Sequence, residues 1–176
     1  MSSTDKTLLD PAAQARLAGR VGRHLDPAPE GRGRRVGVAC ARFNGGVTTR
    51  LLEGALEALA ERGVEPHDVT VAWAPGAFEL PLTARALAAG GPDAVIALGA
   101  VIRGDTGHYD FVAGECARGL QDVALSTGVP VVFGVLTTDT VDQALERSRA
   151  DGSNKGREAA ETALSSAALL RGLAAR

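Results

Sequence analysis

The chain has 176 residues, 45% of them hydrophobic and 23% charged, which is the composition of one globular domain and excludes a disordered or fibrous protein. Its formal net charge of −2 excludes a general nucleic-acid binder, in which basic residues prevail. No segment approaches the roughly 20 apolar residues that span a bilayer, and residues 1–20 are too polar for an export signal, so the sequence predicts a cytoplasmic protein without a membrane partner.

Residues 1–34 are expected to form an N-terminal arm that is flexible or docked on a neighbouring subunit. A short helix is expected to start at Asp10 and Pro11. Pro27, Pro29 and two glycines then interrupt any regular structure. The arginines of this segment are interpreted as the charged side chains of a solvated tail.

From Arg35 onward, short apolar runs alternate with helical patterns. Runs that are apolar on both faces predict buried strands over 35–41, 68–74, 93–103 and 130–138. Leucines at i, i+4 and i+7 (Leu52, Leu56 and Leu59) predict the apolar face of a helix over 47–62. Periodicity and capping residues predict further helices after Pro75-Gly76, over 111–126, from Thr140 to about Arg149, and after Asn154.

Alternating strands and helices predict a parallel sheet that is covered on both sides. Right-handed crossovers then give an α/β, flavodoxin-like three-layer sandwich with a four-stranded parallel sheet in the order 2-1-3-4 and helices on both faces. Cys40 and Cys116 lie within apolar runs and are expected to be small core residues.

Ligands of open α/β sheets bind beyond the carboxyl ends of the strands. This rule selects the loops 42–46, 75–79, 103–110 and 136–139. Of only six aromatic residues in the chain, Phe43, Phe78, Tyr109 and Phe111 lie in or beside these loops. An aromatic side chain at the end of a strand suits stacking on a planar ligand, although spacing alone leaves open that Phe43 folds back onto the sheet.

The loop over 103–110 is the richest in chemistry. The backbone N–H groups of Asp105 and Thr106 lie just ahead of a predicted helix, where an anion is favoured. His108 can transfer a proton near neutral pH, although a single histidine is more often an ordinary surface residue.

A second basic cluster is formed by Arg147 and Lys155. Lys155 opens a helix, where its charge opposes the helix dipole and a bound phosphate would explain it; the sequence leaves this open. Arg147 closes the preceding helix, where arginine commonly compensates the dipole. The chain lacks G-x-G-x-x-G after its first strand, a P-loop, a nucleophile elbow and metal-ligand spacing.

Taken together, several segments resemble the lumazine synthase family: ARFN (41–44), PGAFELP (75–81), ALGAVIRGDTGHYDFV (97–112), GVLTTDTVDQALERS (134–148) and SNKG (153–156). The resemblance implies a catalytic domain over 35–176. It implies riboflavin biosynthesis, by condensation of 5-amino-6-(D-ribitylamino)uracil with 3,4-dihydroxy-2-butanone 4-phosphate to 6,7-dimethyl-8-ribityllumazine, with release of phosphate and water. It further implies no metal or organic cofactor, and self-association into pentamers or larger assemblies, an icosahedral shell among them.

The resemblance also implies roles for individual residues. His108, Arg147 and Lys155 are the expected catalytic residues: the histidine transfers protons, the arginine holds phosphate, and the lysine lies near the same pocket. Phe133 occupies a position that in the family reaches a neighbouring subunit's site. Asp105 carries a carboxylate beside the expected phosphate and is expected to point outward. The expected substrate-binding residues are Phe43, Asn44, Gly76, Ala77, Phe78, Glu79, Ala100, Val101, Ile102, Asp105, Thr106 and Phe133.

Two alternatives to the synthase are less compatible with the sequence. An archaeal-type riboflavin synthase on the same fold is disfavoured by the GVLTT and SNKG segments. A lumazine- or flavin-binding carrier, or a purely structural shell subunit, is disfavoured because Phe43, His108 and Arg147 are all present. A protein that only binds needs no residue for proton transfer.

Overall fold

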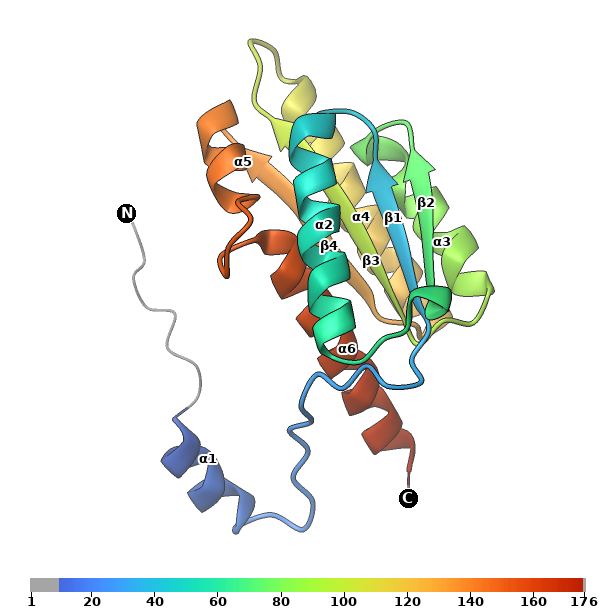
Figure 1. Cartoon of the computed structure of the whole chain (residues 1–176), viewed down its shortest axis with the longest axis vertical. Coiled ribbons are helices and arrows are strands. Elements are labelled where there is room, and N and C mark those ends of the chain that lie inside the picture. Colours follow the sequence, from blue (N-terminus) through green and yellow to red (C-terminus); the bar gives the residue numbers. More distant parts are fainter. Residues whose placement is uncertain (1–9, 176) are drawn as a thin grey trace.

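A computed structural model describes residues 10–175, so residues 1–9 of the predicted arm lie outside the described residues. Four parallel strands form a sheet in the order β2-β1-β3-β4 (Figure 1). The strands are β1 (Val36–Ala41), β2 (Val69–Ala74), β3 (Ala94–Ile102) and β4 (Val131–Thr138). The predicted fold class and strand order are confirmed.

Helices cover both faces of this sheet (Figure 1). On one face, α2 (Gly45–Glu61) and α6 (Lys155–Ala174) enclose a core with Val38, Ile96 and Leu98. On the other face, α3 (Leu80–Ala89) and α4 (His108–Thr127) enclose a second core with Val95 and Ala97. The remaining elements are α1 (Pro11–Ala18), α5 (Val141–Arg147) and the 3₁₀ turns η1 (Pro66–Asp68) and η2 (Ala77–Glu79).

The described part of the arm contains the predicted short helix and then contacts the domain. Asp10 caps α1 through its carboxylate. Arg23 donates from Nη2 to the carbonyl of Ala175 at 2.6 Å, beside the end of α6. Gly31 donates from its backbone N–H to the Arg62 carbonyl at 2.8 Å. The domain boundary after residue 34 stays a prediction.

The two cysteines belong to the core, as predicted. Cys40 lies on the α2–α6 side of the sheet and Cys116 on the α3–α4 side, and both are fully buried. Burial raises the pKa of the Cys40 thiol to about 11 and that of Cys116 to about 12. Both thiols are therefore protonated near neutral pH and act as small apolar side chains.

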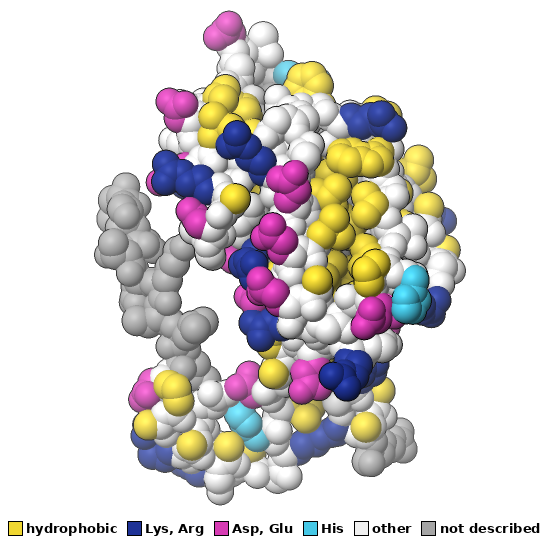
Figure 2. All heavy atoms as spheres, viewed as in Figure 1, with side chains coloured by type: hydrophobic (Ala, Val, Ile, Leu, Met, Phe, Trp, Pro, Cys, Tyr) yellow, Lys and Arg dark blue, Asp and Glu magenta, His cyan; other side chains and the backbone are white. Residues whose placement is uncertain are grey.

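The apolar face of α2 differs from the prediction. Leu51, Ala55 and Leu59 are almost completely buried, whereas Leu56 is 37% exposed. Leu56 instead borders a groove with Val69 and Val71 of the edge strand β2, and Figure 2 shows hydrophobic side chains exposed on this side of the molecule. The buried face is rotated relative to the predicted one because α2 must contact both the sheet and α6. The small alanines of α2 allow that close approach.

Two helix boundaries also differ from the prediction. α4 begins at His108, three residues before the predicted start at Phe111. Gly107 ends the preceding loop, and the Thr106 hydroxyl accepts the N–H of His108 at 3.4 Å. α5 ends at Arg147, and the predicted capping box is half formed: Thr140 accepts from the Gln143 N–H, but the Gln143 side chain accepts from Asp139 instead of Thr140.

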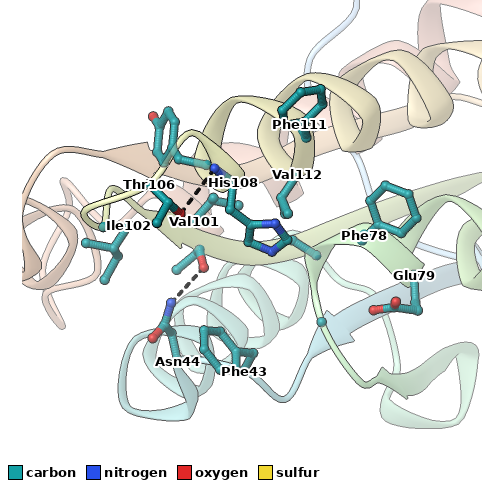
Figure 3. A pocket seen from close by; sticks show the side chains of 15 residues that line it. Phe43, Asn44, Phe78, Glu79, Val101, Ile102, Thr106, His108, Phe111 and Val112 are labelled. Atoms are coloured by element: carbon teal, nitrogen blue, oxygen red, sulfur yellow. Dashed lines mark hydrogen bonds between the residues drawn. The ribbon is translucent and has the colours of Figure 1, made fainter.

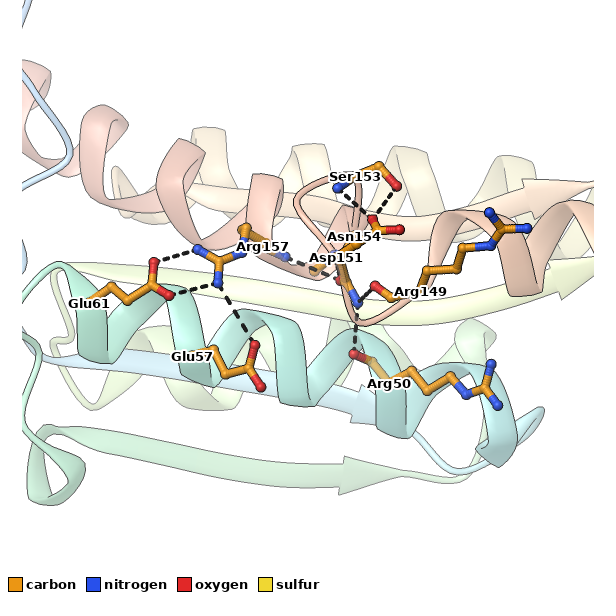
Figure 4. A network of polar contacts seen from close by, with 9 residues as sticks. Arg50, Glu57, Glu61, Arg149, Asp151, Ser153, Asn154 and Arg157 are labelled. Atoms are coloured by element: carbon orange, nitrogen blue, oxygen red, sulfur yellow. Dashed lines mark hydrogen bonds and ion pairs between the residues drawn. The ribbon is translucent and has the colours of Figure 1, made fainter.

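Asn154 joins α2, the α5–α6 loop and α6 (Figure 4). Its side chain is buried, caps α6 by accepting the Gly156 N–H at 2.8 Å, and donates to the carbonyls of Arg50 at 3.1 Å and Arg149 at 2.9 Å. A Cβ on Gly54 would lie 2.5 Å from this amide, and a Cβ on Gly156 would lie 1.8 Å from the Leu51 carbonyl oxygen. The SNKG segment is thus required for the close packing of α6 on α2.

Further along the same interface, Arg157 of α6 binds the Glu61 carboxylate of α2 with two hydrogen bonds of 2.5 and 2.9 Å, and Glu57 lies 3.8 Å from it (Figure 4). The hydrogen bond to Arg157 holds the pKa of Glu61 below its ordinary value. The interface of the two helices is therefore apolar toward the sheet and ionic at its rim.

Replacing Gly156 by Ala should destabilise the protein. The added methyl meets backbone, which can yield only if α6 shifts, and overpacking of this kind typically costs about 1–3 kcal/mol. Gly114 of α4 is the matched control, because a Cβ there meets nothing within 4 Å. Gly114→Ala should raise the free energy of unfolding by about 0.4–1 kcal/mol. Urea unfolding of both variants tests the difference, and a Gly156→Ala variant as stable as Gly114→Ala would contradict this account of the packing.

Candidate active site

A cavity of about 540 Å³ opens at the carboxyl ends of the strands, beside the start of α4 (Figure 3). It is formed by three chain segments that follow β1, β2 and β3, together with the last residues of β3. Its lining residues are Phe43, Asn44, Gly76, Ala77, Phe78, Glu79, Ala100, Val101, Ile102, Gly104, Thr106, His108, Tyr109, Phe111 and Val112.

The segment after β1 is held to the sheet by Asn44. Asn44 has φ 58°, a left-handed conformation that asparagine tolerates better than most residues. Its side chain donates to the Ala100 carbonyl of β3 at 2.9 Å, which leaves its amide oxygen free to accept from a ligand. Phe43 is 71% exposed and lines the cavity, so it does not fold back into the core.

The segment after β2 brings an aromatic ring and a carboxylate to the same cavity. Phe78 and Glu79 lie in η2, and Phe78 is 56% exposed. A Cβ on Gly76 would lie 3.2 Å from a carboxylate oxygen of Glu79, so the absence of a side chain at Gly76 leaves space for that carboxylate. Figure 3 shows Phe43, Phe78 and His108 around one opening.

The third segment combines the glycine-rich loop after β3 with the first turn of α4. His108 is the first residue of a 20-residue helix, and Phe111 and Val112 follow at i+3 and i+4 on the same side. Thr106 lines the cavity ahead of the helix N-terminus, where backbone N–H groups favour an anion. Asp105 is exposed and does not line the cavity, as its expected outward orientation requires.

The other predicted residues lie in a second hollow of about 400 Å³, along the edge strand β4. Phe133 of β4, Arg147 at the end of α5 and Lys155 at the start of α6 all line it. The two hollows share no lining residue. A single chain therefore does not bring Arg147 and Lys155 together with His108 and Thr106.

Charged side chains of the second hollow already have partners within the chain. Lys155 Nζ lies 2.5 and 2.6 Å from the two carboxylate oxygens of Glu158. This acidic residue in the first turn of α6 offsets the unfavourable position of a lysine at the positive end of a helix. Arg147 donates from Nη1 to the Gln143 carbonyl at 3.0 Å, which leaves its other donors available. The proposal that an anion binds here stays a prediction.

Comparison with known proteins decides the family. The family model of 6,7-dimethyl-8-ribityllumazine synthase matches residues 33–171. A curated 6,7-dimethyl-8-ribityllumazine synthase from Edwardsiella ictaluri (strain 93-146) is 56% identical over 143 residues, which cover 80% of this chain and 92% of that protein. The chain belongs to the lumazine synthase family. The matched range of this family member includes every residue that lines the two hollows.

Four lining residues of this lumazine synthase family member are not among the substrate-binding residues that the sequence predicts. Gly104, Tyr109, Phe111 and Val112 also line the cavity. The sequence places Tyr109 and Phe111 among the few aromatic residues beside the strand-end loops, but it assigns them no role in the site. Glu158 carried a weaker signal, its i+3 spacing from Lys155.

Within residues 10–175, no group of His, Cys, Asp and Glu side chains could hold a metal ion, and no helix is long and apolar enough to cross a membrane.

Proposed function

We propose that this chain, as a 6,7-dimethyl-8-ribityllumazine synthase of riboflavin biosynthesis, works in active sites shared between copies. Each site would combine the cavity of one copy with the β4–α6 hollow of the next. One observation carries the proposal: residues suited to the pyrimidine and to proton transfer line one hollow, and the two cationic residues expected to hold phosphate, Arg147 and Lys155, line another. Neither hollow alone holds a complete set for the condensation.

In the proposed site, Phe43 stacks on the pyrimidine of 5-amino-6-(D-ribitylamino)uracil. The backbone of Ala100, Val101 and Ile102 meets the polar edge of the ring. The ribityl hydroxyls meet the free amide oxygen of Asn44, the Glu79 carboxylate and the backbone at Gly76 and Ala77. Phe78 is exposed at the same opening and closes this side of the cavity.

The phosphate of 3,4-dihydroxy-2-butanone 4-phosphate then lies on the N–H groups of Asp105 and Thr106, at the positive end of α4. Arg147 of the neighbouring copy binds it with charge-assisted hydrogen bonds, and Lys155 adds a point charge. His108 accepts and returns protons as the amine attacks the ketone and water leaves to form the imine. Phosphate is then eliminated, and the ribitylamino nitrogen attacks the remaining carbonyl and closes the second ring with loss of a second water. Phe133 of the neighbour covers the reacting atoms.

Self-association into pentamers or larger assemblies belongs to the same proposal. Four phenylalanines are substantially exposed in one chain, Phe43 by 71%, Phe78 by 56%, Phe111 by 72% and Phe133 by 42%. Such a concentration of exposed aromatic rings is typical of a surface that another copy covers. A cyclic ring pairs one surface with a different one, which is what two complementary half-sites require.

A cytoplasmic location is also part of this proposal. It is supported by Cys40 and Cys116, which lie on opposite sides of the sheet as free thiols. Free thiols are typical of proteins in a reducing compartment.

Mixed assemblies test the shared site. His108→Ala and Arg147→Ala chains, each with its own tag, are co-expressed and purified through both tags. Formation of lumazine is followed by absorbance at a phosphate-substrate concentration below the wild-type KM, where Arg147→Ala alone is slow. In a randomly mixed ring, about a quarter of the interfaces join an intact cavity to an intact β4–α6 hollow, so about a quarter of wild-type activity should return. Light scattering must show an oligomer. Activity that stays at the level of either variant alone would contradict the shared site.

Replacing Phe43 by Ala should weaken binding of a ribityl-pyrimidine analogue. An aromatic pair contributes about 0.5–1.5 kcal/mol beyond the area that it buries, so affinity should fall several-fold or more. Phe43→Tyr or Phe43→Trp should restore most of it, because each keeps a ring at this position. Titration calorimetry gives the dissociation constant. Since Phe43 is exposed, its loss should leave the unfolding midpoint almost unchanged; normal affinity with impaired folding would refute the stacking role.

A further inference from the structure

We propose that Arg103 is a positioning residue, which holds the glycine-rich loop so that Thr106 and His108 take their places in the cavity. The inference rests on the proposed function for its consequence, but its structural content is independent of it. Arg103 lines neither hollow. It is the first residue after β3, where its backbone N–H bonds the Thr138 carbonyl of β4 at 2.9 Å.

The side chain of Arg103 joins both ends of the loop. Its guanidinium carbon lies 4.0 Å from the centre of the Tyr109 ring, and Nη1 and Nη2 each lie 3.5 Å from the Asp110 carboxylate. Only residues 104–107 lie between Arg103 and the first residue of α4, and two of them are glycine. Glycine leaves such a loop many alternative conformations, so contacts between its ends restrict it strongly.

The same guanidinium is anchored on the other side by the turn that leads into α5. Its Nε lies 3.0 Å from the Asp139 carboxylate, and this hydrogen bond raises the pKa of Arg103 above its ordinary value. The Asp139 N–H donates to the Gln143 side chain at 3.0 Å, and the Gln143 carbonyl accepts from Arg147 at 3.0 Å. A continuous series of contacts therefore runs from the first turn of α4 to the proposed phosphate-binding arginine of the same chain.

Stability and function should respond differently to the loss of Arg103. Its side chain is 44% exposed, and the carboxylates of Asp110 and Asp139 are more exposed still. Exposed ion pairs contribute little to global stability. A displacement of about 1 Å in a catalytic group can nevertheless lower a rate by about a hundredfold. A planar guanidinium is needed both to stack and to bind two carboxylates, so Lys is not an equivalent replacement.

Arg103→Met is the principal test, with Arg118→Met as matched control. Arg118 lies on α4 with two carboxylate partners, Glu115 and Asp122, and lines neither hollow. Arg103→Met should lower kcat/KM about ten- to a hundredfold, through both kcat and the KM of the phosphate substrate. Affinity for a ribityl-pyrimidine analogue should stay within about twofold, and the unfolding midpoint should match that of Arg118→Met. Arg103→Lys and Asp139→Asn should each show part of the effect.

Hydrogen exchange provides a readout that needs no activity. The amides of residues 104–108 should exchange about tenfold faster in Arg103→Met than in wild type. In Arg118→Met their exchange rates should equal those of wild type. If wild type forms no lumazine, the proposed function fails while this measurement still tests the positioning role. Unchanged exchange together with unchanged kinetics would overturn the positioning role of Arg103. If Arg103→Met does not fold, Arg103→Lys and Asp139→Asn carry both measurements, with the same outcomes deciding.

Discussion

His108→Ala should lower kcat by about 10²–10⁴-fold, the usual contribution of a general acid or base. His108 is the first residue of α4 and lines the cavity, with the loop residues 104–107 just before it. An imidazole is the side chain best suited to general acid and base catalysis near neutral pH. Affinity for a ribityl-pyrimidine analogue should stay near wild type, because in the proposed site that substrate meets Phe43 and Asn44, which lie in another segment.

Stopped-flow absorbance of lumazine formation gives kcat, and calorimetry gives the affinity. His67→Ala is the matched control, because His67 lies in the η1 turn with its side chain 79% exposed and lines a different depression. His108→Gln should remain as slow as His108→Ala, since an amide donates a hydrogen bond but does not transfer protons. A kcat for His108→Ala equal to that of His67→Ala would remove His108 from the mechanism.

Arg147→Ala should raise the KM of the phosphate substrate about ten- to a hundredfold, because a hydrogen bond to a charged group contributes about 1.5–3 kcal/mol. The KM of the pyrimidine should change far less. Arg147→Lys should rescue only part of the loss, since an ammonium group cannot bind phosphate through two parallel hydrogen bonds. Steady-state kinetics with each substrate varied in turn makes the comparison.

A purely structural role for Arg147 makes different predictions. Arg147 is the last residue of α5 and donates to the Gln143 carbonyl one turn earlier, so the alternative role is compensation of the helix dipole at its negative end. If that were its whole role, Arg147→Ala would lower the unfolding midpoint slightly and affect both substrates equally. Arg149, exposed in the following loop and outside both hollows, serves as control. Inorganic phosphate should protect wild type and Arg149→Ala from thermal unfolding more than it protects Arg147→Ala.

Sequence patterns predicted the sheet because its strands are largely apolar, although only β1 and β3 are buried along their length, and the edge strands β2 and β4 are partly exposed. Residues such as Val38, Ile96 and Leu98 can only be buried if helices lie above and below them, and parallel strands require crossovers of one hand. The strand order and the positions of the first three site loops followed from these constraints. A local signal also sufficed for the Asn154 cap of α6.

The site was predictable as far as its residues lie at strand ends. Phe43, Phe78 and His108 were selected by that rule, and they meet in one cavity. Phe111 was placed beside these loops but given no role, and Val112 was not selected, because the start of α4 depends on the loop before it, where the Thr106 hydroxyl and Gly107 set the first turn. A shift of three residues in a helix start changes which side chains face a cavity.

The sequence by itself determined the layers of this protein, its strand order and the chemical groups of its site, because burial and strand geometry act through local patterns that one chain carries. Only the tertiary structure decided how those groups are distributed. It separates Phe133, Arg147 and Lys155 from His108, since β4 is an edge strand whose outer side faces away from the cavity. It also brings Arg103 against Tyr109 and Asp139. This contact depends on how the segments after β3 and β4 lie at the end of the sheet, which no local sequence pattern specifies.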